Sequence, residues 1–224
     1  DYTAFTAIKN FKGLSFKTQE SSVLAGYAAA AFSTKGVVAT YGGAPYPTVT
    51  AFMDGFAQGV FYFNQVKNKG VRVLGWNRDT KNGEFVGDFA NTSKALQISK
   101  NFEQAGADVI FPVAGGLGGA TAGNSIASKK SVVIWVDTDG FVAAPQYKKV
   151  LLTSVVKGVD TSVKGVILDV ANNKFSSTGY VGTLKNGGTK LAPYHDLIRM
   201  VPSALRSEVT KLGTDISNKK VSVK

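Results

Sequence analysis

Short runs of β-branched and other apolar residues alternate along this chain with longer segments whose apolar residues recur at helical spacing. The runs predicted to be strands are residues 37–41, 71–76, 108–113, 131–136 and 150–156. The segments predicted to be helices are residues 49–67, 91–105, 121–128, a stretch from Asp160 and a stretch after Pro202. Because neighbouring parallel strands need a crossover connection, usually a helix, this alternation predicts an α/β fold with a mostly parallel sheet.

The last third of the chain carries two amphipathic patterns and a turn signal. The helix that begins at Asp160 has apolar residues that we expect to face inward: Val163, Val166, Ile167 and Val170. The helix after Pro202 has an apolar face of its own: Leu205, Val209, Leu212 and Ile216. Between the two helices, glycine and asparagine within residues 178–188 predict a terminal hairpin.

The predicted elements divide unevenly along the chain. Residues 71–188 hold four predicted strands and three predicted helices, enough for a complete lobe, whereas the residues before them supply one clear strand. One strand is too few for a parallel sheet that is covered on both faces. We therefore expect a partial first lobe at residues 1–68 that is truncated at its amino end, a second lobe at 69–190, and a segment at 191–224 whose helix returns toward the first lobe.

The residue types present exclude several kinds of active site. The chain has no cysteine, so disulfides, thiolate nucleophiles and thiolate metal ligands are excluded. Its one histidine, His195, stands in the predicted surface turn Pro193-Tyr194-His195-Asp196, without a nucleophile–base pair or a metal cluster. No apolar run approaches the roughly 18 residues that a membrane-spanning helix needs. We therefore expect a binding protein with no enzymatic activity, metal or cofactor.

The net charge of +11 favours an acidic partner. The lysines are scattered singly or in pairs such as Lys148-Lys149, with no arginine-rich stripe and no interleaved aromatic platform. This distribution argues against a nucleic-acid partner. It favours a general attraction to a negatively charged cell surface.

Polar and aromatic residues follow the predicted strands at the edge where open parallel sheets bind ligands. They are Gly42-Gly43, Phe111 with the glycine-rich loop 115–119, Asp137, Asp139 and Lys157. A carboxylate can accept two hydrogen bonds from the vicinal hydroxyls of a ribose, and such a charge-assisted bond contributes about 1.5–3 kcal/mol. An aromatic ring can stack on a flat heterocycle. This set of residues predicts a nucleoside-like ligand.

Each of these residues also has a structural interpretation that the sequence leaves open. The glycine-rich loop is compatible with a tight packing turn, and it matches neither G-x-G-x-x-G nor the lysine-bearing phosphate-loop spacing. Phe111 is compatible with core packing, and Asp137 or Asp139 with a turn cap. Lys157 is compatible with a solvated helix entry.

Four stretches of the sequence, taken in order and spacing, resemble the basic membrane protein family, the substrate-binding lipoproteins of ABC transporters that include purine-nucleoside receptors. They are GLSFKTQE at 13–20 with LAGY at 24–27, GADVIF at 106–111 with AGG at 114–116, VDTD at 136–139, and LTSVVKGVD at 152–160. The likeness covers essentially the whole chain.

The resemblance implies a periplasmic-binding-protein-like fold of two Rossmann-like lobes, joined by a hinge, that close on a ligand. It implies an ABC permease as partner and an extracytoplasmic location, with a lipid anchor on the cell membrane in the full-length precursor. We expect a monomer.

The resemblance also implies roles for individual residues. Phe111 would stack on the base, and Gly116 would offer a backbone contact. Asp139 or Asp137 would bind the ribose hydroxyls, and Lys157 a ribose oxygen. Glu20 occupies the place of an acidic group of the first lobe that contacts the base.

The sequence also departs from the family. The amino-terminal strand and the Asp- and Phe-bearing loop that form the opposite wall of the cleft have no counterpart here, nor does the lipid-anchoring cysteine, and Gly140 stands where many members carry Gln. Two other functions remain open. One is a receptor for another small ligand, such as a sugar or a flavin, and the other is a surface lipoprotein that acts as an adhesin through its basic charge.

Overall fold

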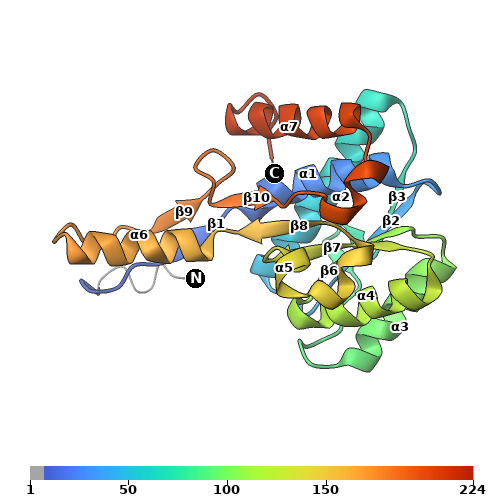
Figure 1. The fold of residues 1–224 in the computed structure, drawn as a ribbon, viewed down its shortest axis with the longest axis horizontal. Coiled ribbons are helices and arrows are strands. Elements are labelled where there is room, and N and C mark those ends of the chain that lie inside the picture. The colour runs from blue at the N-terminus through green and yellow to red at the C-terminus, as the bar shows by residue number, and fades with distance from the viewer. Residues whose placement is uncertain (1–7, 224) are drawn as a thin grey trace.

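A computed structural model of the chain describes residues 8–223, and its main body is built around one sheet (Figure 1). Within the described residues this sheet has six strands in the order β10, β8, β7, β6, β2, β3. They are β2 (Val37–Gly42), β3 (Arg72–Leu74), β6 (Val109–Val113), β7 (Val132–Asp137), β8 (Leu151–Lys157) and β10 (Thr189–Leu191). Adjacent strands are parallel, except that β10 runs antiparallel to β8. The predicted α/β fold with a mostly parallel sheet is confirmed.

Helices cover both faces of this sheet (Figure 1). One face carries α1 (Thr18–Phe32), α2 (Pro47–Lys67) and α7 (Ser203–Ser217), and the other carries α3 (Thr92–Gln104) and α4 (Gly118–Ser128). The apolar face predicted for the last helix is confirmed, and all four of its residues are buried: Leu205, Val209, Leu212 and Ile216. None of the helices in residues 8–223 has both the length and the apolar character to cross a membrane.

Shorter elements complete the main body. The 3-10 turn η2 (Gly115–Leu117) leads from β6 into α4. Between β7 and β8 lie α5 (Gly140–Ala143) and η3 (Pro145–Val150), and η4 (His195–Met200) joins β10 to α7. The predicted strand at 71–76 is interrupted at Gly75, which has a φ of +80°, so β3 gives way to a small hairpin of β4 (Trp76–Asn77) and β5 (Asn82–Gly83).

Glycine lets α1 and α2 cross with their backbones in contact. A Cβ built on Gly26 would lie 1.9 Å from the carbonyl oxygen of Phe56, and one on Gly59 would lie 2.1 Å from the carbonyl oxygen of Val23. No side chain fits these positions, because the nearest atoms are backbone and cannot rotate away. The crossing therefore sets how closely the first two helices lie on the sheet.

A smaller extension projects from one side of the main body (Figure 1). It consists of α6 (Val159–Ala171) and a parallel pair of short strands, β1 (Leu14–Phe16) and β9 (Tyr180–Gly182). The amide of Lys17 donates to the carbonyl of Gly182 at 2.7 Å, and the amide of Gly158 donates to that of Gly188 at 2.9 Å. The chain thus passes between the two parts at residues 17, 158 and 183–188.

Two predictions for this region are wrong. The apolar residues of α6 were expected inward, but Val163, Ile167 and Val170 are 40%, 61% and 55% exposed. The strands within residues 178–191 do not form a hairpin, because β9 pairs with β1 whereas β10 pairs with β8. The amphipathic pattern was interpreted correctly as a helix, but an apolar face does not specify which element covers it.

The lobe boundary predicted at residues 68 and 69 does not separate two bodies. β2, from the first segment, lies between β3 and β6 and pairs with both. Strand β10 and α7 also belong to the main body, through β8 and α1. The prediction failed because strand order in a parallel sheet does not follow chain order. The strand before the boundary is a central strand of the same sheet.

Candidate functional site

A pocket of about 250 Å³ lies beyond the carboxyl ends of the parallel strands. We call it the strand-end pocket. It is lined by Tyr46, Thr48, Val49, Phe52, Phe89, Val113, Gly115, Val136, Asp137 and Lys157. These residues come from the ends of β6, β7 and β8, from the start of α2, and from the segment that follows β5. The pocket therefore occupies the edge at which open α/β sheets bind ligands.

An ion pair forms the charged part of the pocket. Lys157 Nζ lies 2.7 Å from Asp137 Oδ1 and 5.0 Å from the centroid of the Phe52 ring, within the usual cation–π range. Asp137 ends β7 in the left-handed region, with a φ of +69°, and Lys157 ends β8, the adjacent strand. Both side chains are only partly buried, at 44% and 26% exposure, so both remain accessible to a ligand.

Two aromatic rings form the apolar part of the pocket. Tyr46 and Phe89 are stacked, with ring centroids 6.3 Å apart and an interplanar angle of 19°. Both rings are exposed, Tyr46 at 59% and Phe89 at 45%. A Cβ on Gly43 would lie 2.3 Å from the Phe89 ring, so glycine directly after β2 is what lets this ring approach. An exposed, held aromatic face of this kind can accept a flat heterocycle.

Phe89 is held by the segment that we call the aromatic loop, residues 84–91. The amides of Val86 and Gly87 donate to the carbonyls of Gly42 and Gly43 at 3.0 and 2.7 Å. The Asp88 carboxylate accepts hydrogen bonds from the amides of Ala90 and Asn91 at 2.8 and 2.7 Å, and these bonds lower the pKa of Asp88. The loop therefore rests on the end of β2 and is closed by a turn at its tip.

Of the residues predicted to bind a ligand, the structure brings Asp137 and Lys157 together in the strand-end pocket. Gly116 lies beside Gly115, which lines the pocket and has a φ of +55°. Both glycines belong to η2, directly before α4, where backbone amides at a helix start can face an electronegative atom.

Phe111 lies in the core, against the expectation that it stacks on a base. It is 0% exposed, and its ring packs against Phe52 and Phe56 with centroids 6.3 and 5.4 Å away. Successive strand residues point to opposite faces, and this position of β6 points toward α2. Phe111 therefore presents no open face to a ligand in this structure.

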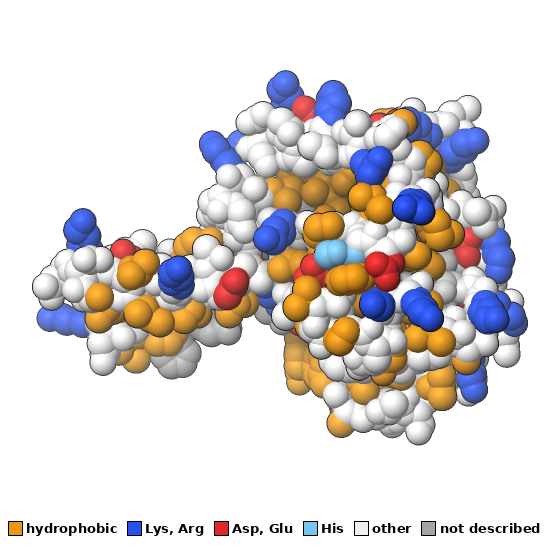
Figure 2. Space-filling view, viewed as in Figure 1, with side chains coloured by type: hydrophobic (Ala, Val, Ile, Leu, Met, Phe, Trp, Pro, Cys, Tyr) orange, Lys and Arg blue, Asp and Glu red, His pale blue; other side chains and the backbone are white. Residues whose placement is uncertain are grey.

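Asp139 is also engaged elsewhere. Its carboxylate caps α5 by accepting the amide of Phe141 at 3.1 Å, and it contacts His195 Nε2 at 2.8 Å. The His195 ring is stacked on Phe141, with centroids 4.1 Å apart at 11°, and Figure 2 shows the histidine between acidic and hydrophobic side chains. His195 thus joins η4 to α5 instead of standing alone in a turn, and Asp139 is committed to this contact.

Glu20 lies in the first turn of α1 and accepts the amide of Leu184 at 2.8 Å. Leu184 belongs to the turn that connects β9 to β10. Glu20 does not line the strand-end pocket. Its hydrogen bond instead links α1 to the segment that joins the extension to the main body.

The sequence interpretation missed the aromatic residues of the pocket, Tyr46, Phe52 and Phe89. Phe89 sits in a loop and at no strand end, so the rule that ligands follow strand ends could not select it. Its one sequence signal is the pair Gly42-Gly43, whose missing side chains leave room for large neighbours.

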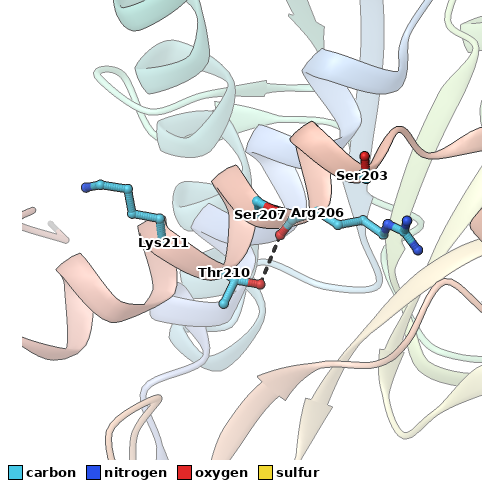
Figure 3. Close-up of a pocket in the computed structure, with 5 residues that line it drawn as sticks. All are labelled: Ser203, Arg206, Ser207, Thr210 and Lys211. Atoms are coloured by element: carbon cyan, nitrogen blue, oxygen red, sulfur yellow. Dashed lines mark hydrogen bonds between the residues drawn. The ribbon is translucent and has the colours of Figure 1, made fainter.

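A second depression, of about 470 Å³, lies on the outer surface of α7 (Figure 3). Its lining is Ser203, Arg206, Ser207, Thr210 and Lys211. The bond drawn there, from Thr210 Oγ1 to the carbonyl of Arg206 at 2.9 Å, is internal to the helix. The residues spread along one helix and do not converge, so this surface is a weaker candidate than the strand-end pocket.

Curated relatives match almost the whole chain. Basic membrane protein A of Borreliella afzelii is 28% identical over 218 residues, which cover 96% of this chain and 61% of that protein. The ABC transporter nucleoside-binding protein BmpA of Lactococcus lactis subsp. cremoris is 29% identical over 229 residues, which cover 96% of this chain and 60% of that protein. The chain thus spans about three fifths of the length of these relatives.

Solved structures support the fold class. An ABC transporter solute-binding protein from Aeropyrum pernix K1 superposes with a TM-score of 0.79 at 20% identity, covering 96% of this chain and 66% of that one. A second solute-binding protein, from Conexibacter woesei, superposes with a TM-score of 0.77 at 17% identity, covering 99% of this chain and 69% of that one. The fold is periplasmic-binding-protein-like, as the sequence resemblance implied.

The match to a family model agrees with these relatives. The model is described as ABC transporter substrate-binding protein PnrA-like, under the name Bmp, and it matches residues 2–224. The chain therefore belongs to the Bmp family of PnrA-like ABC transporter substrate-binding proteins.

Proposed function

We propose that this chain provides the ligand-binding lobe of an ABC transporter substrate-binding protein, and that the strand-end pocket receives a nucleoside. The observation that carries the proposal is the Asp137–Lys157 ion pair, at 2.7 Å, in one pocket with the exposed rings of Tyr46 and Phe89. The name of the Lactococcus lactis relative, a nucleoside-binding protein, supports the same class of ligand.

The chemistry of the pocket suits the two halves of a nucleoside. The carboxylate of Asp137 accepts hydrogen bonds from ribose hydroxyls, and the ammonium of Lys157 donates to a ribose oxygen. The base extends the aromatic stack at Phe89, since a flat ring lies well against another ring. Because Phe111 is buried, we assign stacking on the base to Phe89. Because Asp139 contacts His195, we assign binding of the ribose hydroxyls to Asp137.

The charge of the pocket favours an uncharged ligand. Among its lining residues the cation is Lys157 and the anion is Asp137, and they neutralise each other. A phosphate group would compete with Asp137 for the only ammonium of the lining and would meet the carboxylate at close range. The pocket is therefore better suited to a nucleoside than to a nucleotide.

The extension belongs, in this proposal, to the first lobe of a two-lobed receptor. Within residues 8–223, the aliphatic face of α6 is exposed and the short β1–β9 pair has no third strand, so neither has the partners that a stable layer needs. The pocket of about 250 Å³ is also below the roughly 300–1,000 Å³ of complete ligand sites, as expected of one wall of a cleft. The alignments cover only 61% and 60% of the two relatives, so the remaining residues of those proteins are enough to form an opposite wall.

The same proposal sets the biological context. Family members are substrate-binding components of transporters and act outside the cytoplasm, so the receptor would hand its ligand unchanged to an ABC permease in the membrane. A lipid anchor would hold it at the membrane surface, and it would act as a monomer.

The test is isothermal titration calorimetry of the chain with inosine, guanosine and adenosine. We expect binding of at least one of them, with an affinity lowered about tenfold or more in Asp137→Ala and in Lys157→Met, since a charge-assisted bond contributes about 1.5–3 kcal/mol. Asp196→Asn, an exposed carboxylate outside the pocket, is the matched control and should leave the affinity unchanged. No heat with any of the three nucleosides, or an unchanged affinity in Asp137→Ala, would overturn the proposal.

A further inference from the structure

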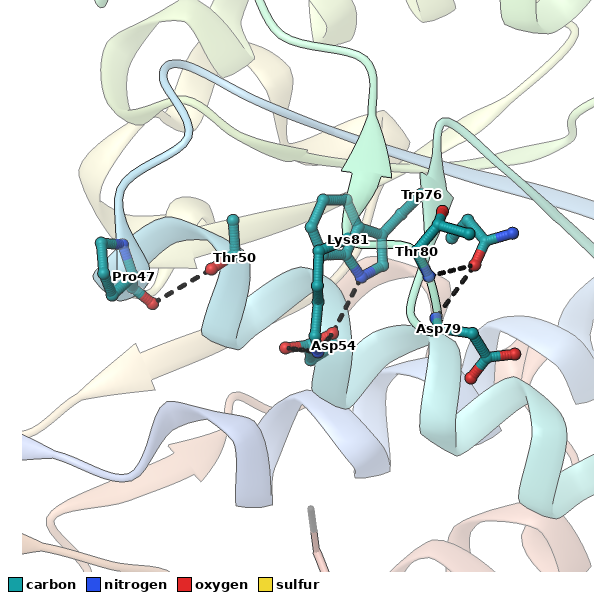
Figure 4. Close-up of polar contacts among 8 residues, drawn as sticks. Pro47, Thr50, Asp54, Trp76, Asp79, Thr80 and Lys81 are labelled. Carbon is teal, nitrogen blue, oxygen red and sulfur yellow. Dashed lines mark hydrogen bonds and ion pairs between the residues drawn. The ribbon is translucent and has the colours of Figure 1, made fainter.

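The partly buried carboxylate of Asp54 on α2 contacts the β4–β5 hairpin, which precedes the aromatic loop (Figure 4). Asp54 Oδ1 accepts a hydrogen bond from the indole Nε1 of Trp76 at 3.0 Å, and both Asp54 oxygens lie 2.8 Å from Lys81 Nζ. The Asp54 side chain is 15% exposed, and Trp76 is 6% exposed. One carboxylate thus contacts Trp76 in β4 and Lys81 in the turn before β5, and it belongs to the helix that carries Phe52 into the strand-end pocket.

The hairpin is short. Its two strands have two residues each, a length that is not stable in water without further packing. Its own turn is closed locally, by Asn77 Oδ1 accepting the amides of Asp79 and Thr80 at 2.9 and 3.1 Å (Figure 4). These bonds shape the turn, whereas the contacts of Trp76 and Lys81 with Asp54 join the hairpin to α2.

A continuous set of contacts leads from Trp76 to the pocket. The Phe85 ring meets the Trp76 ring edge-on, with centroids 6.1 Å apart at 87°. The two residues after Phe85 bind the end of β2 through their amides, and the next turn carries Phe89 into the pocket. Movement of the Trp76 ring would therefore move the base of the aromatic loop.

We propose that Asp54 is a positioning residue for the strand-end pocket: by holding Trp76 and Lys81, it sets where the aromatic loop places Phe89. The inference rests on the proposed function for its binding consequences, but its structural part stands on the contacts alone. Removal of the carboxylate leaves the buried Trp76 N–H without its acceptor and Lys81 without its partner, so the hairpin can shift while the sheet below it stays intact.

The first arm of the test needs no ligand. Amide hydrogen exchange, followed by NMR on the full chain, should be about tenfold faster or more at Val86 and Gly87 in Asp54→Ala, because these amides open with the loop. The exchange rates of the β6 amides should be unchanged. In Asp54→Asn, which keeps an acceptor for Trp76, the exchange rates of Val86 and Gly87 should lie between those of the parent and of Asp54→Ala. Glu208→Ala is the matched control, since it removes contacts with Tyr27 and Lys67 on α1 and α2 away from the pocket. Equal exchange at Val86 and Gly87 in the parent and in Asp54→Ala overturns the inference.

The second arm is a double-mutant cycle on nucleoside affinity. If Asp54 acts through Phe89, Asp54→Ala should weaken binding about tenfold in the parent and less than about twofold in Phe89→Ala, because residues on one path are not additive. Equal losses in both backgrounds overturn the inference. If the parent binds no nucleoside, the proposed function fails, and the exchange arm alone decides the role of Asp54.

Lys81→Met is a second variant for the case in which Asp54→Ala does not fold. It leaves Trp76 and Asp54 in place and should give a partial effect in both arms.

Discussion

Two carboxylates that stand two residues apart in the sequence have different environments. Asp137 ends β7 in a left-handed conformation that Asp tolerates better than most residues, and this conformation brings it to Lys157. Asp139 lies past the turn, where it caps α5 and holds His195. At this scale the backbone after the strand, and not residue type, decides which carboxylate is available to a ligand.

The turn at the tip of the aromatic loop should respond to pH through Asp88. The two backbone amides that bind its carboxylate favour the charged form, so the pKa of Asp88 lies below its usual value in the folded protein. The turn is therefore fully stabilised above the ordinary Asp pKa of about 3.9 and loses this support only when the pH falls through the lowered pKa. The amide shifts of Ala90 and Asn91, followed by NMR, should report a transition in that acid range.

Asp88→Asn is the matched variant for this prediction. Its amide oxygen can still accept from Ala90 and Asn91 but does not titrate in the acid range, so the transition should disappear. A transition centred at or above the ordinary carboxyl pKa in the parent chain would contradict the assignment to Asp88.

At the scale of elements, the α1–α2 crossing depends on the absence of side chains. Gly26→Ala or Gly59→Ala would place a Cβ within 1.9 or 2.1 Å of a backbone oxygen of the other helix. We expect each to lower the free energy of unfolding by about 1–3 kcal/mol or more, because the two helices must move apart. For a chain of this size that is a fall in Tm of about 2–4 °C per kcal/mol, measurable by calorimetry.

Gly165→Ala is the control for the crossing. Gly165 lies within α6 and has nothing within 4 Å of an added Cβ, so alanine should leave Tm unchanged or raise it slightly. Similar losses in Gly165→Ala and Gly59→Ala would mean that the effect is not specific to the crossing.

At the scale of the whole molecule, the extension presents an apolar face that the described residues leave open. The exposed aliphatic residues of α6 are Val159, Val163, Ile167, Leu168 and Val170, and Figure 2 shows hydrophobic side chains gathered along this part. A contiguous apolar face on a protein surface often marks a site of contact with another surface. In the 224-residue chain the face should bind a hydrophobic dye and promote self-association.

Ile167→Glu should reduce both effects. We expect lower dye fluorescence and a smaller weight-average mass by sedimentation at high concentration, with little change in the Tm of the main body, because the helix projects away from it (Figure 1). Val142→Glu is the matched control, since Val142 is a 73% exposed aliphatic residue on α5, in the main body. Dye binding that is equal in Ile167→Glu and in the parent would show that this face is covered.

Local patterns in the sequence determined the elements and part of the site. Alternation of strand and helix patterns predicted a parallel sheet, and the apolar face of the last helix followed from its helical period. Asp137 and Lys157 could be predicted as neighbours because both end strands, and parallel strands end at one edge. These properties depend on residues close together in the chain.

The tertiary structure decided the rest. Packing between distant segments made β2 a central strand of the one sheet and buried Phe111 in the core. It also placed Asp139 against His195 and brought Phe89 to the pocket on a loop whose amides bind Gly42 and Gly43. Each outcome depends on which distant segments pack together. Periodicity identifies the face that an element must bury, but only packing between segments far apart in the sequence decides what covers that face and what stays open to a ligand.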